Sequence, residues 1–294
     1  MLNIPGLRAP RGYHETTSVT DRHRKWRAKL GRDLLTSIEQ RNVAIVKSCL
    51  EQQADPGVVD LKSGCGALHL AARIGDCEVM NEILHACIRS KVDLTSEDAS
   101  QRTPLDEALE VGQRSHLPAD VIVPLLAAGK EAREIVSELQ GSLEKWRQAL
   151  RIMLECCSFP VSMAQEDAMQ VLMESWSFTG ERGGPPSKVQ ELRIALFTCV
   201  VKNNVAGVEA LALAKADLNR LDPKSNRTAM ELSEALLHHP VTDVLRHHGA
   251  SSRRNPNFPQ WALCLAAASG NVQGTLKWIE HGEAGNFADV SASW

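Results

Sequence analysis

The stretch from Gly66 to Leu84 constrains the fold most strongly, because its apolar residues follow two short helical patterns in succession. Gly75 and Asp76 separate the two patterns, and Gly75 can take the left-handed conformation that ends a helix. Small residues at positions 71 and 72 allow a neighbouring helix to approach closely. The stretch therefore predicts a helix–turn–helix unit with two apolar faces, formed by Leu68, Leu70, Ala71 and Ala72 and by Val79, Ile83 and Leu84.

This unit resembles the ankyrin repeat, whose signature is a T-P-L-H-x-A-A run, a Gly and a V-x-x-L-L run. His69 stands in the fourth place of the signature, where the family has a buried His that forms hydrogen bonds between repeats. Thr103 and Pro104 restore the first two places one unit later, since Thr caps a helix and Pro fits its first position. Gly270 lies in another echo, at 262–271. The resemblance implies an all-α ankyrin-repeat solenoid of about six units plus a helical insert.

The spacing of equivalent residues agrees with the family's period of about 33 residues. Leu34 and Leu68 are 34 residues apart, and Met230 and Leu263 are 33 apart. We therefore expect repeats 1–3 and repeats 4–6 to form two blocks. The predicted segments are a disordered leader (1–20), a basic capping helix (21–32), ankyrin repeats 1–3 (33–129), a helical insert or degenerate repeat (130–178), a Gly/Pro loop (179–188), ankyrin repeats 4–6 (189–290) and a tail (291–294).

The hairpin from 216 to 228 is the best preserved of the chain. It resembles the family pattern A-D-V-N-x-x-D-x-x-x-G-x-T, with Asn226 in the Gly place and Thr228 in the Thr place. Asn is the other residue that tolerates positive φ. We therefore expect a tight turn at Asn226 and a helix that begins after Thr228.

The insert at 130–178 lacks the signature but keeps apolar residues at three- and four-residue steps. Its stripe of Met and Trp, which includes Trp146 and Met169, is interpreted as a helical core that joins the two blocks. The alternative is a groove that binds a helix of a partner.

Composition limits the classes of function. The net charge of −3 gives no support for a nucleic-acid role of the whole chain. The eight cysteines form no C-x-x-C pair, which is typical of reduced, mostly buried thiols in an intracellular protein. No apolar run of about 18 residues exists to span a membrane. The expected location is the cytoplasm, with the nucleus as an alternative; Arg8 and Arg11 leave organelle targeting open as a further interpretation.

Each group of residues that could form a metal or catalytic site is better explained by a structural role. Two His pairs, His238-His239 and His247-His248, could meet across a helical hairpin, but adjacent histidines rarely give zinc geometry. Gly64-Cys65-Gly66 is the only elbow-like nucleophile, and its glycines suit a turn. We therefore expect no catalytic residue, metal site, cofactor or small-molecule substrate.

A stack of helix pairs offers an extended surface rather than a dry pocket, so the chain is predicted to be a protein–protein interaction module or scaffold. Members of the family bind protein partners through hairpin tips and the inner face of the first helices. The resemblance implies the same here for an unidentified protein partner. The expected exposed tip residues are Lys62, Glu97, Asp98, Lys224, Arg253 and Arg254.

Two alternatives remain open. The chain could be the regulatory ankyrin portion of a larger enzyme or channel. It could also bind nucleic acid through the basic segment 22–32, around Trp26. The favoured interpretation of that segment is a polar cap, in which Trp26 and Leu30 cover the first repeat.

Overall fold

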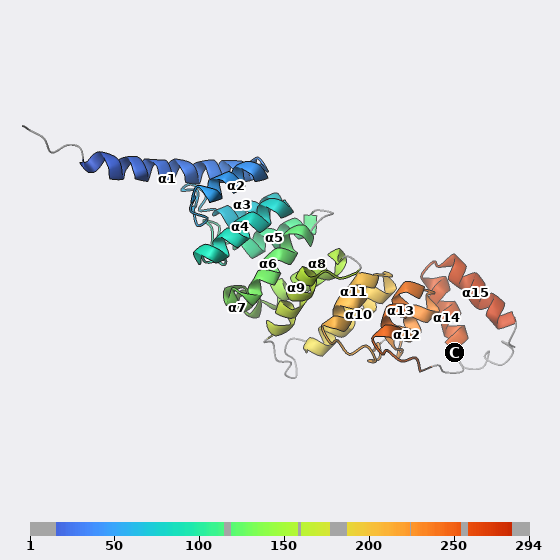
Figure 1. The fold of residues 1–294 in the computed structure, drawn as a ribbon. Coiled ribbons are helices and arrows are strands. Elements are labelled where there is room, and N and C mark those ends of the chain that lie inside the picture. The colour runs from blue at the N-terminus through green and yellow to red at the C-terminus, as the bar shows by residue number, and fades with distance from the viewer. Residues whose placement is uncertain are drawn as a thin grey trace, which may run out of the picture. The chain divides into compact units, whose positions relative to one another are not determined.

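The computed structural model describes residues 16–114, 119–157, 160–176, 187–223, 225–253 and 258–283. Within these ranges the chain forms fifteen α-helices, one short 3₁₀ turn and no β-strand (Figure 1). Val59 and Gly66 make an isolated antiparallel bridge. The predicted all-α class is confirmed for the described residues.

The chain divides into two compact units, residues 1–104 and 105–294. The boundary lies at the start of α5, inside the third predicted repeat. The two units are therefore described separately.

Unit 1 consists of helices that contact each other in pairs. Helix α1 contacts α2 and α3, whereas α4 contacts α2 and α3. Gly75 ends α3 in the left-handed conformation with φ of 75°, and the Asp76 carboxylate accepts from the amide of Val79 to cap α4. The helix–turn–helix prediction for 66–84 is confirmed. The helices are α1 (Thr16–Glu39), α2 (Val43–Glu51), α3 (Ala67–Ile74) and α4 (Cys77–Ser90).

Helix α1 corrects the predicted beginning of the chain. The leader was expected to extend to residue 20 and the cap from 21 to 32, but one continuous helix runs from Thr16 to Glu39. No Gly or Pro interrupts 16–30, so a helix anchored by the buried Leu30, Leu34 and Ile38 can propagate towards its amino end. Trp26 is 45% exposed, so the expectation that it covers the first repeat is wrong. Residues 1–15 lie outside the described part.

Unit 2 begins with α5, which Pro104 opens as predicted, and continues through successive contacting helices. In its second half, α12 contacts α10 and α14, and each of these first helices contacts the helix that follows it. The helices are α5 (Pro104–Arg114), α6 (Ala119–Ala127), α7 (Arg133–Gly141), α8 (Leu143–Cys156), α9 (Met163–Glu174), α10 (Lys188–Val201), α11 (Val205–Leu213), α12 (Ala229–Ala235), α13 (His239–His247), α14 (Phe258–Ala268) and α15 (Val272–Glu283).

The second helices of unit 2 recur at a nearly constant interval. Helices α11, α13 and α15 begin at Val205, His239 and Val272, 34 and 33 residues apart. In unit 1, α2 and α4 begin at Val43 and Cys77, which is again an interval of 34.

The segment 130–178 is helical, as predicted, and contains α7, α8 and α9. Trp146 is fully buried, and its indole N–H donates to the carbonyl oxygen of Leu172 at 2.7 Å. Trp176 lies edge-on to Trp146, with ring centroids 4.6 Å apart. Met153 and Met169 are also buried, so this part of the Met and Trp stripe is core. Met173 and Trp176 of the same stripe are half-buried.

Two predicted connecting segments lie largely outside the described residues. The Gly/Pro loop was expected at 179–188, but Ser187 caps α10 and Lys188 is its first residue, while 177–186 are not described. The predicted tail at 291–294 also lies outside the described part, which ends at residue 283.

Candidate functional site

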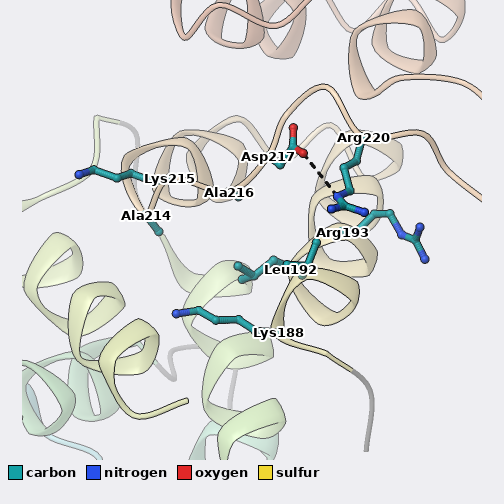
Figure 2. Close-up of a pocket in the computed structure, with 9 residues that line it drawn as sticks. Lys188, Leu192, Arg193, Ala214, Lys215, Ala216, Asp217 and Arg220 are labelled. Atoms are coloured by element: carbon teal, nitrogen blue, oxygen red, sulfur yellow. Dashed lines mark ion pairs between the residues drawn. The ribbon is translucent and has the colours of Figure 1, made fainter. Parts of the chain in front are cut away.

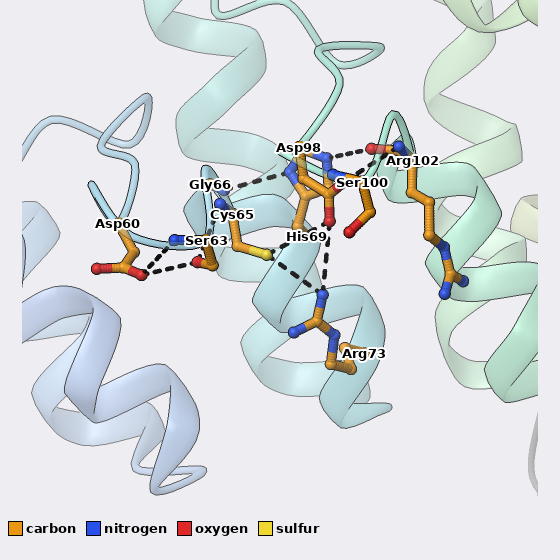
Figure 3. Close-up of polar contacts among 9 residues, drawn as sticks. All are labelled: Asp60, Ser63, Cys65, Gly66, His69, Arg73, Asp98, Ser100 and Arg102. Atoms are coloured by element: carbon orange, nitrogen blue, oxygen red, sulfur yellow. Dashed lines mark hydrogen bonds and ion pairs between the residues drawn. The ribbon is translucent and has the colours of Figure 1, made fainter.

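The loop that precedes α3 is folded around the carboxylate of Asp60 (Figure 3). One carboxylate oxygen accepts from the amide of Ser63 at 3.0 Å and from its hydroxyl at 2.7 Å. Gly64 follows with φ of 67° and donates its amide to the carbonyl of Asp60 at 2.8 Å. A side chain at Gly64 would place its Cβ 2.9 Å from the amide nitrogen of Ala99, so only Gly fits.

The loop that precedes α12 repeats this arrangement 162 residues later in sequence. Asp222 accepts from the amide and hydroxyl of Ser225, both at 2.8 Å, and Asn226 donates its amide to the carbonyl of Asp222 at 2.8 Å. Asn226 has φ of 52°, as its place in the hairpin predicted. The common sequence is Asp, two variable residues, Ser, and then a residue of positive φ. Sequence reasoning missed this shared turn, although D-x-x-S-G/N is visible in both loops.

His69 joins its own loop to the next one in unit 1. Its Nδ1 accepts from the amide of Gly66 at 3.3 Å, and its Nε2 lies 2.9 Å from the carbonyl oxygen of Arg102, 33 residues later. Because Nδ1 accepts, Nε2 carries the proton and donates to that carbonyl. The side chain is 1% exposed. The hydrogen bond expected between His69 and the following loop is present, and both ring nitrogens are used by the backbone.

Asp98 is buried, which corrects its prediction as an exposed tip residue. It is 8% exposed, and one carboxylate oxygen accepts from the amides of Ser100 at 2.8 Å and Arg102 at 3.0 Å. Burial raises the pKa of Asp98, but these amides, the Cys65 thiol and nearby His69 outweigh burial and hold it below its ordinary value. The carboxylate folds its own loop instead of facing solvent, because these amides lie two and four residues ahead.

Cys65, Arg73 and Asp98 are in mutual contact (Figure 3). The Cys65 thiol donates to Asp98 at 3.6 Å, and the Arg73 guanidinium lies 3.2 Å from the sulfur and 3.8 Å from the carboxylate. Cys65 is 2% exposed and lies in a turn, as expected for Gly64-Cys65-Gly66. The cluster therefore connects the loops before α3 and α5 within unit 1.

The remaining tip residues differ in what the structure shows. Lys62, Glu97 and Arg253 are exposed, as predicted. Lys224 and Arg254 lie outside the described residues. Gly270 has a positive φ of 72°, as expected for a residue that ends a helix. Thr228 caps α12 as predicted: its hydroxyl accepts from the amide of Glu231, and the Glu231 carboxylate accepts from the amide of Thr228. Thr103 is buried immediately before α5.

A second recurring contact links successive helix pairs of unit 2. The residue immediately before each of α11, α13 and α15 reaches the end of an earlier helix; Asn204 and Asn271 also cap their own helices, whereas the His238 side chain makes no capping hydrogen bond. Asn204 donates to the carbonyl of Leu154 at 2.6 Å, His238 Nδ1 lies 2.8 Å from the carbonyl of Val200, and Asn271 donates to the carbonyl of Leu236 at 2.8 Å. We call Asn204, His238 and Asn271 the cap ladder. Its members are 34 and 33 residues apart.

The two His pairs do not meet across a hairpin, which corrects that expectation. His238 and His239 lie at the start of α13 and His247 and His248 at its end. A nine-residue helix separates them by roughly 13 Å. Within the described ranges, no three His, Cys, Asp or Glu side chains gather to hold a metal ion.

Half of the eight cysteines are buried, fewer than expected, since Cys264 is exposed and three others are half-buried. Burial raises the pKa of the Cys87, Cys157 and Cys199 thiols to about 12. These three therefore remain protonated near neutral pH.

No protein-family model matches this chain, and no curated protein matches its sequence. No helix in the described part of the chain has the length and apolar character needed to cross a membrane.

Proposed function

We propose that this chain is an ankyrin-type repeat protein that binds a protein partner through its loop tips. The observation that carries the proposal is the shared turn of Asp60-Ser63 and Asp222-Ser225, which recurs at the equivalent place in the two units. The cap ladder, at intervals of 34 and 33 residues, supports the same repeat period of about 33. In this proposal, 33–129 and 189–290 are the repeat blocks and 130–178 joins them.

The buried polar side chains of each tip form hydrogen bonds that stabilise the loop, so only the exposed side chains are available to contact a partner. Asp60, His69 and Asp98 are used in hydrogen bonds within and between loops. Lys62 and Glu97 are exposed on the loops before α3 and α5, and Arg253 is exposed in the segment between α13 and α14. A rigid loop that presents exposed charges is suited to recognise a macromolecular surface, because little ordering entropy is lost on binding.

The test is quantitative affinity capture from the source cells with the full chain as bait. One variant reverses the tip charges with Lys62→Glu and Glu97→Lys, and a second carries Lys224→Glu, Arg253→Glu and Arg254→Glu. The control, Lys47→Glu, changes an exposed charge on α2. A partner that is retained by the wild type and the control but lost with a tip variant supports the proposal. Equal capture by all of the proteins would refute a role of the tips.

A second candidate function rests on α1. The segment 23–29 is exposed throughout and contains five basic or His side chains around Trp26. Cations beside an exposed aromatic ring are suited to contact a nucleic acid, through phosphates and base stacking. The sequence favoured a cap in which Trp26 is covered, whereas the exposure of Trp26 and its basic neighbours supports polyanion binding by α1.

A further inference from the structure

A cavity of about 230 Å³ lies between the start of α10 and the segment that follows α11, within unit 2 (Figure 2). Part of its lining is apolar and comes from Val189, Leu192, Ala214 and Ala216. Leu192 is buried, whereas Val189 is 42% exposed. The cavity therefore combines a packed interior with an apolar edge that faces solvent.

The rest of the lining is strongly cationic. Lys188, Arg193, Lys215 and Arg220 also line the cavity, together with the single carboxylate of Asp217. Asp217 pairs with Arg220 at 3.4 Å, so it offsets only one of the four cations (Figure 2). Among the described residues, the other three form no ion pair. This local excess of positive charge contrasts with the chain's net charge of −3.

Among the described residues, neither Arg193 nor Lys188 has a carboxylate partner. The Arg193 Nε is buried and has no hydrogen-bond partner within the described part of the chain. The Lys188 ammonium donates to the carbonyl of Met173 at 2.6 Å, and burial lowers its pKa. A buried N–H without an acceptor and an ammonium whose only contact among the described residues is a neutral oxygen are both stabilised by an added anion.

A second hollow of about 370 Å³ adjoins the first and shares Ala214 and Lys215 with it. It lies between α9 and α11 and is lined by Met169, Met173 and Leu213, together with Gln170 and the carboxylate side chain of Glu166. Leu213 is 41% exposed. Two partly apolar hollows that share Ala214 and Lys215 can receive successive side chains of one polypeptide segment.

We propose that these two hollows, here called the α9–α11 groove, bind an acidic peptide segment of the protein partner, with an aliphatic side chain in the cationic cavity and Asp or Glu residues beside it. This inference rests on the proposed function and specifies the chemistry of the partner. The first cavity is smaller than most small-molecule sites, which are about 300–1,000 Å³, and suits one side chain. Its apolar lining does not suit inorganic phosphate, while its cations are complementary to carboxylates.

The test is selection of short random peptides on the full chain, with counter-selection on a Lys188→Glu/Lys215→Glu double variant. Affinities of the selected peptides are then measured by fluorescence anisotropy. A Lys47→Glu/Lys202→Glu variant makes the same charge change at exposed sites outside the groove. An Ala214→Met variant fills the point shared by both hollows without altering charge.

The proposal expects peptides in which Asp or Glu flank an aliphatic residue. Their affinity should fall by about tenfold or more with the double variant and with Ala214→Met, and should be unchanged with the control. Peptides that bind all four proteins equally would overturn the groove and leave partner binding at the tips intact. Failure to select any acidic peptide would also overturn it. A wild-type dimer that the double variant dissociates, measured by sedimentation, would instead assign the surface to self-association and overturn the proposal.

Discussion

The side-chain amide of Asn271 performs two roles at once, because it caps α15 and donates to the carbonyl of Leu236 in the preceding helix pair. Its Oδ1 accepts from the amide of Gly274 at 2.9 Å, while its Nδ2 reaches Leu236 at 2.8 Å. Asn204 has the same pair of contacts, with Gly207 and with Leu154. One residue therefore fixes both the start of a helix and its position against the previous pair.

Replacing Asn271 should separate the two roles. Asn271→Asp keeps an acceptor for Gly274 but removes the donor to the buried Leu236, and should lower the free energy of unfolding by about 1–3 kcal/mol. Asn271→Ala also loses the cap, which adds about 1 kcal/mol. Urea unfolding measures both changes. Asn203→Asp makes the same chemical change at an exposed residue and should have little effect; an Asn271→Asp protein as stable as wild type would contradict the ladder.

Asp98 should give the protein a stability that depends on pH in the acid range. Its folded pKa is below the unfolded value, so its contribution is complete above the unfolded pKa of about 3.9 and is lost as pH falls through the folded pKa. At pH 7, Asp98→Asn should destabilise by about 1–2 kcal/mol, because it weakens charge-assisted hydrogen bonds.

The difference between the wild type and Asp98→Asn should narrow as the pH is lowered below about 4. Chemical unfolding at a series of pH values measures this. Asp243→Asn is the control, since the side chain of Asp243 is 73% exposed. A difference that stays constant down to pH 2 would show that the charge of Asp98 does not stabilise the loop.

Gly207 should tolerate no side chain. A Cβ there would lie 2.7 Å from the Cys199 sulfur and 2.9 Å from the capping amide of Asn204, so Gly207→Ala should destabilise by about 1–3 kcal/mol. Gly141→Ala is the matched control, because no atom lies within 4 Å of its added Cβ and it ends α7. That variant should be neutral or stabilising by up to about 1 kcal/mol. Thermal unfolding measures both changes. The melting temperature of Gly207→Ala should lie below that of the wild type, and the melting temperature of Gly141→Ala should equal or exceed it.

The basic face of α1 should control retention on a polyanion if the second candidate function is correct. The variant Arg24→Gln/Lys25→Gln/Arg27→Gln should elute from heparin at lower salt, with a salt slope smaller by about 1 for each anionic group that the helix no longer neutralises. The control carries Lys47→Gln, Lys62→Gln and Lys202→Gln, the same number of lysine or arginine changes elsewhere. Equal elution of both variants would exclude α1 as the binding element.

Local rules predicted the helix ends better than they predicted the contacts between loops. Gly75 and Thr228 act through residues within one turn, so their roles could be read from the sequence. The burial of Asp98 could not, because the same Asp type occurs in exposed tips and only the folded loop directs amides onto its carboxylate. The contact between Asn204 and Leu154 spans 50 residues and crosses the segment without the signature. The cationic cavity was also missed, since Lys188 and Arg220 are brought together only by packing of α10 against α11.

The cap ladder also determines how unit 2 would respond to mechanical load. Each rung ties a hairpin to an earlier one, so the rungs act in series rather than in parallel. Tension applied between residues 187 and 283 would load the His238–Val200 and Asn271–Leu236 rungs with the same force, so the weaker rung would break first and the chain would lengthen in steps rather than all at once.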